Sequence, residues 1–198
     1  MLNDLLLLWL AAFTLMASPG PATLSLAAIG TAYGFRRGVP YLFGIMAGTW
    51  GVLVLIATGI TAIILTQPLL MGVVTTAAAA YILYLAWKIA TAPVGVKAVA
   101  SDTAPAALPG FLLAIANPKA FAAIGAAYAG HTLVETDLLA DTLAKVAALT
   151  VMVVIVNVGW LSFGAAFSRV LSHPTLGRIA NITFAIMLVS SVGVALLS

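Results

Sequence analysis

The sequence predicts an all-α membrane protein with six transmembrane helices, on the basis of its composition, its length and its apolar runs. Hydrophobic residues make up 64% of the 198 residues and charged residues only 7%, and the mean hydropathy is +1.21. A soluble domain carries roughly a quarter of its residues as charges, so this chain could not cover a soluble surface. At about 20 residues for each span, its length allows about six spans with short loops.

Apolar runs separated by proline, glycine and charged residues place the six helices. The expected spans are residues 5–33, 40–66, 69–90, 108–130, 143–167 and 176–197. Each is long enough to cross the ~30 Å hydrocarbon core of a bilayer. No basic residue precedes the first run, so this run is expected to be a retained helix and not a cleaved signal peptide.

The basic residues predict the orientation of these helices. Three alternate connections carry most of them: Arg36 and Arg37, then Lys88 and Lys97, then Arg169 and Arg178. The opposite side holds Glu135, Asp137 and Asp141, with Lys145 as its cation. Because basic loops stay in the cytoplasm, both termini are expected to lie outside.

An odd number of spans in each half predicts an internal symmetry. Residues 1–90 and 108–198 each hold three expected spans, so the two halves must run in opposite directions through the membrane. The segment 91–107, rich in proline and alanine, is predicted to be a cytoplasmic linker between them. Two inverted three-helix repeats are typical of secondary transporters. We therefore expect residues 1–198 to form a single transmembrane transporter domain.

Two proline-containing breaks interrupt the first and fourth expected helices. Their residues are Ser18, Pro19, Gly20 and Pro21 in the first helix, and Asn117, Pro118 and Lys119 in the fourth. Ser18 and Asn117 are good N-caps, and a proline follows each at a position where its missing N–H costs nothing. Each restart would leave free N–H groups and a positive dipole end near the bilayer centre, where a carboxylate can bind. All seven residues are candidate substrate-binding residues; the alternative for the first break is a plain proline kink.

Lys119 is the one charged residue that these spans place deep in the hydrocarbon region. An ionisable residue inside a membrane is functional by default. Desolvation and the helix N-terminus both disfavour its ammonium form, so Lys119 is expected either to bind an anion or to release a proton. It is thus the candidate for both substrate binding and proton coupling. The alternative is a fourth helix that begins later, with Lys119 reaching out to the interface.

Three further polar side chains lie near the centres of expected spans. Trp50 falls in the second helix, and Asn157 and Trp160 lie about one turn apart in the fifth. Their N–H and amide groups are expected to line a solute cavity, with interior packing as the alternative. In the second helix, Gly44 and Gly48 begin a stripe of small residues that continues to Gly51 and is typical of close helix packing.

The sequence resembles the LysE/RhtB superfamily of amino-acid exporters along essentially its whole length. The residues that carry the resemblance are Pro19-Gly20-Pro21, the loop Gly34-Phe35-Arg36-Arg37-Gly38, the helix from Gly44 to Gly51, the run from Ala80 to Lys88, and Asn117-Pro118-Lys119. The resemblance implies a small inner-membrane secondary exporter, usually with proton antiport and often dimeric. Where the family commonly has a proline- and aromatic-containing exit segment, this chain has Tyr128-Ala129-Gly130-His131. Ala86 and Ala185 also stand where glycine is expected.

Residues and resemblance together predict a secondary exporter of amino acids or small carboxylate-bearing metabolites that works by alternating access. The sequence has no Walker-type loop, so a proton gradient is the expected driver; the proton carrier is either Lys119 or a loop acid. A cadmium-type cation exporter of the same architecture is the alternative, although no acidic, cysteine or histidine ligand falls at mid-membrane. An intramembrane enzyme ranks lower, because no catalytic constellation occurs in the spans. No cofactor and no nucleic-acid partner is expected.

Overall fold

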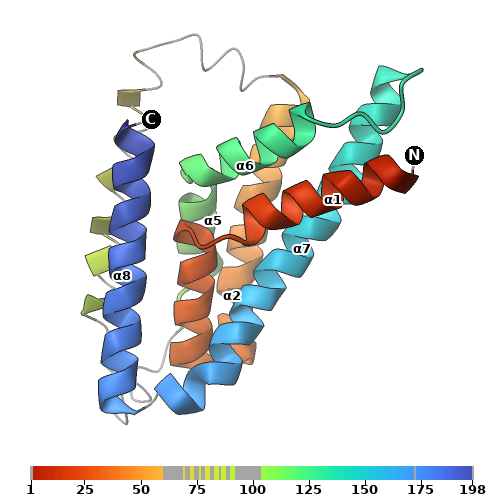
Figure 1. Cartoon of the computed structure of the whole chain (residues 1–198). Coiled ribbons are helices and arrows are strands. Elements are labelled where there is room, and N and C mark those ends of the chain that lie inside the picture. Colours follow the sequence, from red (N-terminus) through yellow and green to blue (C-terminus); the bar gives the residue numbers. More distant parts are fainter. Residues whose placement is uncertain are drawn as a thin grey trace.

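The computed structural model describes residues 2–59, 104–171 and 173–197, with scattered residues between 69 and 91. Helices are the regular structure of this described part (Figure 1), as the all-α prediction requires. They are α1 (Leu2–Ala17), α2 (Pro21–Ala57), α5 (Ala107–Ile115), α6 (Pro118–Ala129), α7 (Leu138–Leu171) and α8 (Pro174–Leu197). Half of the expected third span, 69–90, and most of the linker, 91–107, lie outside the described residues.

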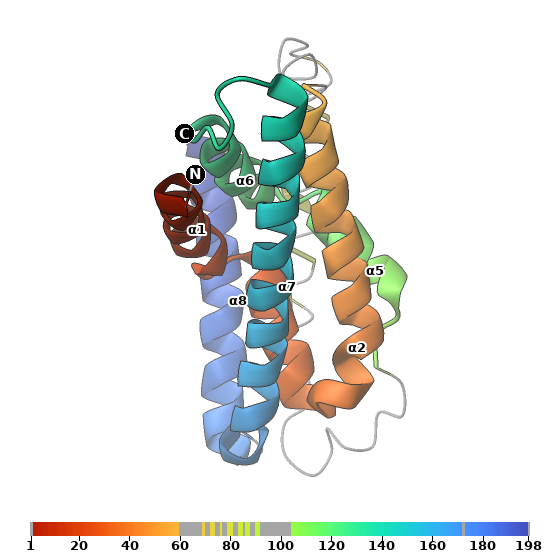
Figure 2. The same ribbon diagram turned by 90° about the vertical axis from the view of Figure 1, so that its right-hand side faces the viewer.

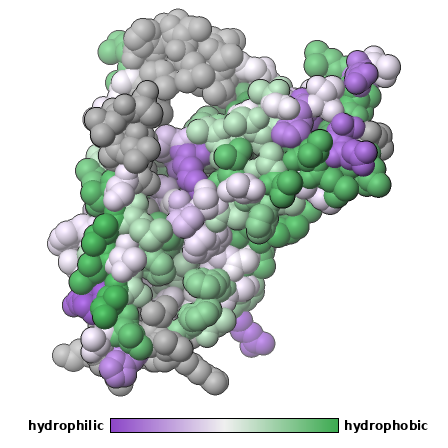
Figure 3. All heavy atoms as spheres, in the orientation of Figure 1, coloured by the Kyte–Doolittle hydropathy of each residue, from purple (hydrophilic) through white to green (hydrophobic). Residues whose placement is uncertain are grey.

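Length and composition make this a helical membrane protein. Helices α2 and α7 are each long and apolar enough to cross a membrane, and the pair α5 and α6, bent by 60°, could form a third, broken span. Apolar side chains cover the sides of α7 and α8 (Figure 3). Among them, Val154 and Ile155 of α7 and Ile179 and Ile186 of α8 are exposed, as expected for surfaces in contact with lipid. The count of six spans and the inverted repeat stay predictions.

Helix α2 consists of two arms that meet at Gly34. This residue has φ 76° and ψ 171°, outside the helical region, and the chain reverses direction there (Figures 1 and 2). A positive φ is readily adopted only by glycine. The expected loop after Tyr33 therefore shrinks to a single residue, and the second arm begins well before Pro40.

Helix α7 also begins earlier than the expected residue 143. Asp137 caps its first turn, because the Asp137 Oδ1 atom accepts hydrogen bonds from the backbone N–H groups of Leu139 at 2.8 Å and Ala140 at 3.1 Å. A side-chain acceptor at this position satisfies donors that the helix leaves free. Charged residues near the helix start had set the predicted boundary too late.

The glycine stripe of α2 contacts α5. A Cβ atom at Gly48 would lie 2.7 Å from the carbonyl oxygen of Phe111, and one at Gly44 would overlap the α5 backbone. A Cβ atom at Gly110 of α5 would likewise lie too close to the α2 backbone. A Cβ atom at Gly51, by contrast, would contact only a side-chain methyl group. The two helices are thus in backbone contact.

A second glycine contact joins α2 to α7. Cβ atoms at Gly30 and Gly164 would overlap the backbone of the opposite helix. Beside them, the Thr31 hydroxyl donates to the carbonyl oxygen of Ala27 at 2.8 Å and to that of Gly164 at 3.2 Å. Small residues and a hydroxyl bond across the interface are typical of membrane helix pairs.

Replacing Gly48 with leucine should disrupt the contact of α2 with α5. The new side chain would have to displace backbone atoms, and overpacking of this kind costs about 1–3 kcal/mol or more. We expect a lower midpoint of thermal unfolding in detergent, measured by near-ultraviolet circular dichroism. Gly159→Leu is the matched control, because no atom lies within 4 Å of a Cβ at that position. Equal midpoints for the two variants would contradict the contact.

Candidate functional site

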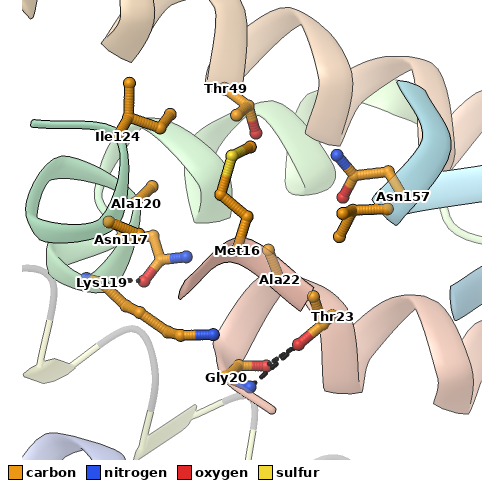
Figure 4. Close-up of a pocket in the computed structure, with 12 residues that line it drawn as sticks. Met16, Gly20, Ala22, Thr23, Thr49, Asn117, Lys119, Ala120, Ile124 and Asn157 are labelled. Carbon is orange, nitrogen blue, oxygen red and sulfur yellow. Dashed lines mark hydrogen bonds between the residues drawn. The ribbon is translucent and has the colours of Figure 1, made fainter. Parts of the chain in front are cut away.

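The two breaks of the chain lie on either side of one cavity. Helix α1 ends at Ala17 and α2 begins at Pro21, while α5 ends at Ile115 and α6 begins at Pro118. The cavity between them has a volume of about 40 Å³ (Figure 4). Its lining residues are Met16, Gly20, Ala22, Thr23, Thr49, Asn117, Lys119, Ala120, Ala123, Ile124, Val156 and Asn157.

The first break differs in detail from the predicted one. The Ser18 hydroxyl donates to the carbonyl oxygen of Leu15 at 2.8 Å, so Ser18 closes α1 and does not cap the next helix. Gly20 is the N-cap of α2: its N–H donates to Thr23 Oγ1 at 2.9 Å, and the Thr23 hydroxyl donates back to the Gly20 carbonyl oxygen at 3.1 Å. With two prolines available, the helix starts at Pro21, because the missing N–H costs nothing at the first helical position.

The second break has the capping predicted from the sequence. Asn117 is the N-cap of α6, and its Oδ1 atom accepts a hydrogen bond from the Lys119 N–H at 3.2 Å. Pro118 occupies the first helical position. The Asn117 side chain is buried and lines the cavity.

The Lys119 side chain connects the second break to the first. Its Nζ atom donates a hydrogen bond to the carbonyl oxygen of Ser18, and Figure 4 shows the side chain extending along the cavity towards Gly20. A Cβ atom at Gly20 would lie only 2.5 Å from Lys119 Cδ and 3.1 Å from Nζ. The side chain therefore points into the protein, where glycine provides the space for it.

Trp160 binds the carbonyl group next to the one that Lys119 binds. The Trp160 indole N–H, from α7, donates to the carbonyl oxygen of Ala17 at 3.1 Å. The last carbonyl groups of a helix have no partner within the helix. At the end of α1, residues from α6 and α7 provide partners for two of these groups.

Of the remaining predicted site residues, Asn157 lines the cavity and the others do not. Asn157 is buried on the cavity wall, and its Nδ2 atom donates to the carbonyl oxygen of Val153 at 2.8 Å. Trp50 is not among the lining residues, and its buried Nε1 atom has no hydrogen-bond partner within the described part of the chain. Five other predicted residues also lie outside the lining set: Ser18, Pro19, Pro21, Pro118 and Trp160. Unlike Trp50, these five belong to the breaks or to the hydrogen bonds made there.

Sequence reasoning missed two polar residues of the cavity, Thr23 and Thr49. Both are buried, and the Thr49 hydroxyl donates to the carbonyl oxygen of Ile45 at 2.8 Å. For Thr23 the spacing gave no clear signal, because the third residue after the cap in a capping box is typically glutamate or glutamine. Thr49 had none, because a threonine in an apolar helix more often bonds only its own backbone.

Lys119 is the single charged residue among those that line the cavity. No group of three histidine, cysteine or acidic residues comes together in the described ranges. The cavity thus combines one ammonium group, the amides of Asn117 and Asn157, and threonine hydroxyls with an otherwise apolar wall. Such an arrangement can bind a small solute that carries a carboxylate.

A buried ion pair on α7 binds the loop between α6 and α7. Lys145 Nζ lies 2.7 Å from Asp141 Oδ2, and both side chains are buried. Asp141 Oδ1 accepts the backbone N–H of Leu133 at 2.6 Å, and Lys145 donates to the carbonyl oxygen of His131 at 3.1 Å. Lys145, which the sequence places in a loop, is therefore buried in the packed structure.

Comparison with known proteins places the chain in a family. The sequence model of the LysE type translocator family matches residues 13–198. Proteins of Salmonella typhimurium (strain LT2) and Salmonella typhi, each named cysteine/O-acetylserine efflux protein, are 29% identical over 187 residues, which is 91% of both chains. A protein of the same name from Escherichia coli O6:K15:H31 is 29% identical over 182 residues, with the same coverage. No solved structure matches. The chain belongs to the LysE family of translocators.

Proposed function

We propose that this protein exports small amino acids across the bacterial inner membrane and that the cavity between the breaks is its substrate site. The observation that carries the proposal is the side chain of Lys119, a lone charge that crosses this cavity from one break to the other. Its relatives are named as cysteine/O-acetylserine efflux proteins, which favours small, uncharged amino-acid side chains. The apolar wall formed by Ala120, Ala123 and Ile124 suits such side chains.

The substrate carboxylate would bind at Lys119, close to the positive dipole ends of α2 and α6. An ammonium group and a helix N-terminus both favour an anion, and the bond is stronger in a cavity with little water. The volume of about 40 Å³ holds roughly three water molecules. An amino acid therefore needs the cavity to open, which supports alternating access between the two halves.

The transport cycle would use the proton gradient, with Lys119 as the group that binds or releases the proton. The described cavity lining offers no other ionisable side chain. In the proposed topology, two inverted repeats place both termini outside and the turn between α7 and α8 in the cytoplasm.

Single cysteines on either side of α7 should test this topology, since the natural sequence contains no cysteine. We expect an impermeant maleimide to label Glu135→Cys in intact cells but His173→Cys only after the membrane is made permeable. Glu135 and His173 are both exposed. Asp137 is avoided because it caps α7. Labelling of both cysteines from the same side would disprove the orientation.

Everted membrane vesicles should accumulate radiolabelled L-cysteine or O-acetyl-L-serine when a proton gradient is imposed. The expected accumulation stops when a protonophore removes the gradient, because a secondary exporter has no other energy source. Vesicles without the protein are the control. Absence of uptake for a panel of labelled small amino acids would refute the proposed function.

Lys119→Met should weaken the binding of an amino acid more than that of its amide, by about 1.5–3 kcal/mol for a lost charged hydrogen bond. If Lys119 also carries the proton, the variant should lose its dependence on the pH gradient but keep substrate exchange. Lys119→Arg separates these roles, because arginine keeps the positive charge and does not release a proton. Wild-type rate, selectivity and pH dependence in both variants would exclude Lys119 from the site.

A further inference from the structure

We infer that the C-terminal end of α1 is the binding position for the α-ammonium group of the substrate, and that the Lys119 side chain fills this position in the substrate-free protein. The inference rests on the proposed function and adds to it the group that recognises the amine. We call this position the ammonium subsite; it comprises the carbonyl groups of Ala17 and Ser18 and the space beside Gly20.

The hydrogen bonds at the end of α1 supply the first argument. The C-terminus of a helix carries a partial negative charge and free carbonyl oxygens, which favour a cation. The Ser18 carbonyl oxygen already accepts a hydrogen bond from an alkylammonium group, that of Lys119. The α-ammonium group of an amino acid has the same charge and the same three donors.

Gly20 supplies a second argument. Its φ of −171° and ψ of 179° are extended values that any residue adopts, so the backbone does not require glycine. Glycine is required here for lack of space, because a Cβ atom would lie 3.1 Å from Lys119 Nζ and 2.5 Å from Lys119 Cδ. The position next to the Ser18 carbonyl group is thus open because residue 20 has no side chain, and an ammonium group occupies it.

Exchange of one ammonium group for another would link binding to opening. When the substrate amine takes the ammonium subsite, the Lys119 side chain must leave and thereby vacates volume that it now fills on the cavity wall. Its freed charge is then available for the substrate carboxylate. An amino acid zwitterion provides an ammonium group for the subsite and a carboxylate for Lys119. A simple amine would displace Lys119 but give it no new partner. A simple acid would not displace Lys119 from the subsite.

An amine without a carboxylate tests the exchange directly. Cysteamine must displace the Lys119 ammonium group from the wild-type protein, but in Lys119→Met no ammonium group occupies the Ser18 carbonyl oxygen. We expect cysteamine to bind this variant about tenfold more tightly than wild type, the ratio expected for one charged hydrogen bond. Affinity is measured from the rise in unfolding temperature of the detergent-purified protein with ligand concentration. Unchanged or weaker binding would overturn the inference, and a merely structural role for Lys119 would not produce tighter binding.

Gly20→Ala tests the subsite by filling its space. The added methyl group should lower the affinity for L-cysteine about tenfold and leave that for N-acetyl-L-cysteine, which has no ammonium group, unchanged. Gly125→Ala in α6 is the matched control, because nothing lies within 4 Å of a Cβ there. If Gly20→Ala binds L-cysteine as Gly125→Ala does, the ammonium subsite is wrong.

The two proposals fail in different ways. Wild-type protein that neither binds nor transports small amino acids refutes the proposed function, while the cysteamine comparison still reports on the subsite. Wild-type protein that transports them, with cysteamine bound equally by wild type and Lys119→Met, refutes only the subsite.

Discussion

The hydrogen bond from Lys119 to the Ser18 carbonyl group is the interaction on which the organisation of this protein depends. Inside a bilayer, every backbone group that a helix break releases must find a partner within the protein. Lys119 and Trp160 bind carbonyl groups at the end of α1. Thr23 and Asn117 accept the N–H groups at the starts of α2 and α6. The two breaks thus depend on each other and on α7 for their stability.

Close helix packing holds this site in place. Helix α2 contacts α5 through Gly44 and Gly48, and α7 through Gly30. Backbone contacts of this kind leave little freedom to adjust, because any shift meets main-chain atoms instead of flexible side chains. By contrast, the cavity lies where α1 ends and α2 and α6 begin, and the long side chain of Lys119 forms part of its wall. Conformational change is therefore expected at the breaks more than at the glycine contacts.

Much of the site could be predicted from the sequence, since proline acts locally. Pro21 and Pro118 fix where helices begin, and Asn117 caps the second of them, as its residue type predicts. The choice of Gly20 over Ser18 as the first cap depends on Thr23 and on the space that Lys119 needs, neither of which follows from local propensity. The bond from Trp160 to Ala17 joins residues far apart in the chain, so no spacing rule could reveal it. The same argument selects Trp50 and Trp160, and neither is among the residues that line the cavity.

A polar cavity in a membrane protein is also a potential leak. Water and small cations would enter it along any path that the two breaks leave open, and each ion that crosses wastes the gradient across the membrane. A fixed positive charge in a narrow, poorly hydrated space repels sodium ions and hydronium ions alike. In the proposed transporter, the ammonium group of Lys119, held at the Ser18 carbonyl group on the cavity wall, would therefore act as an electrostatic barrier to cations whenever no solute is bound.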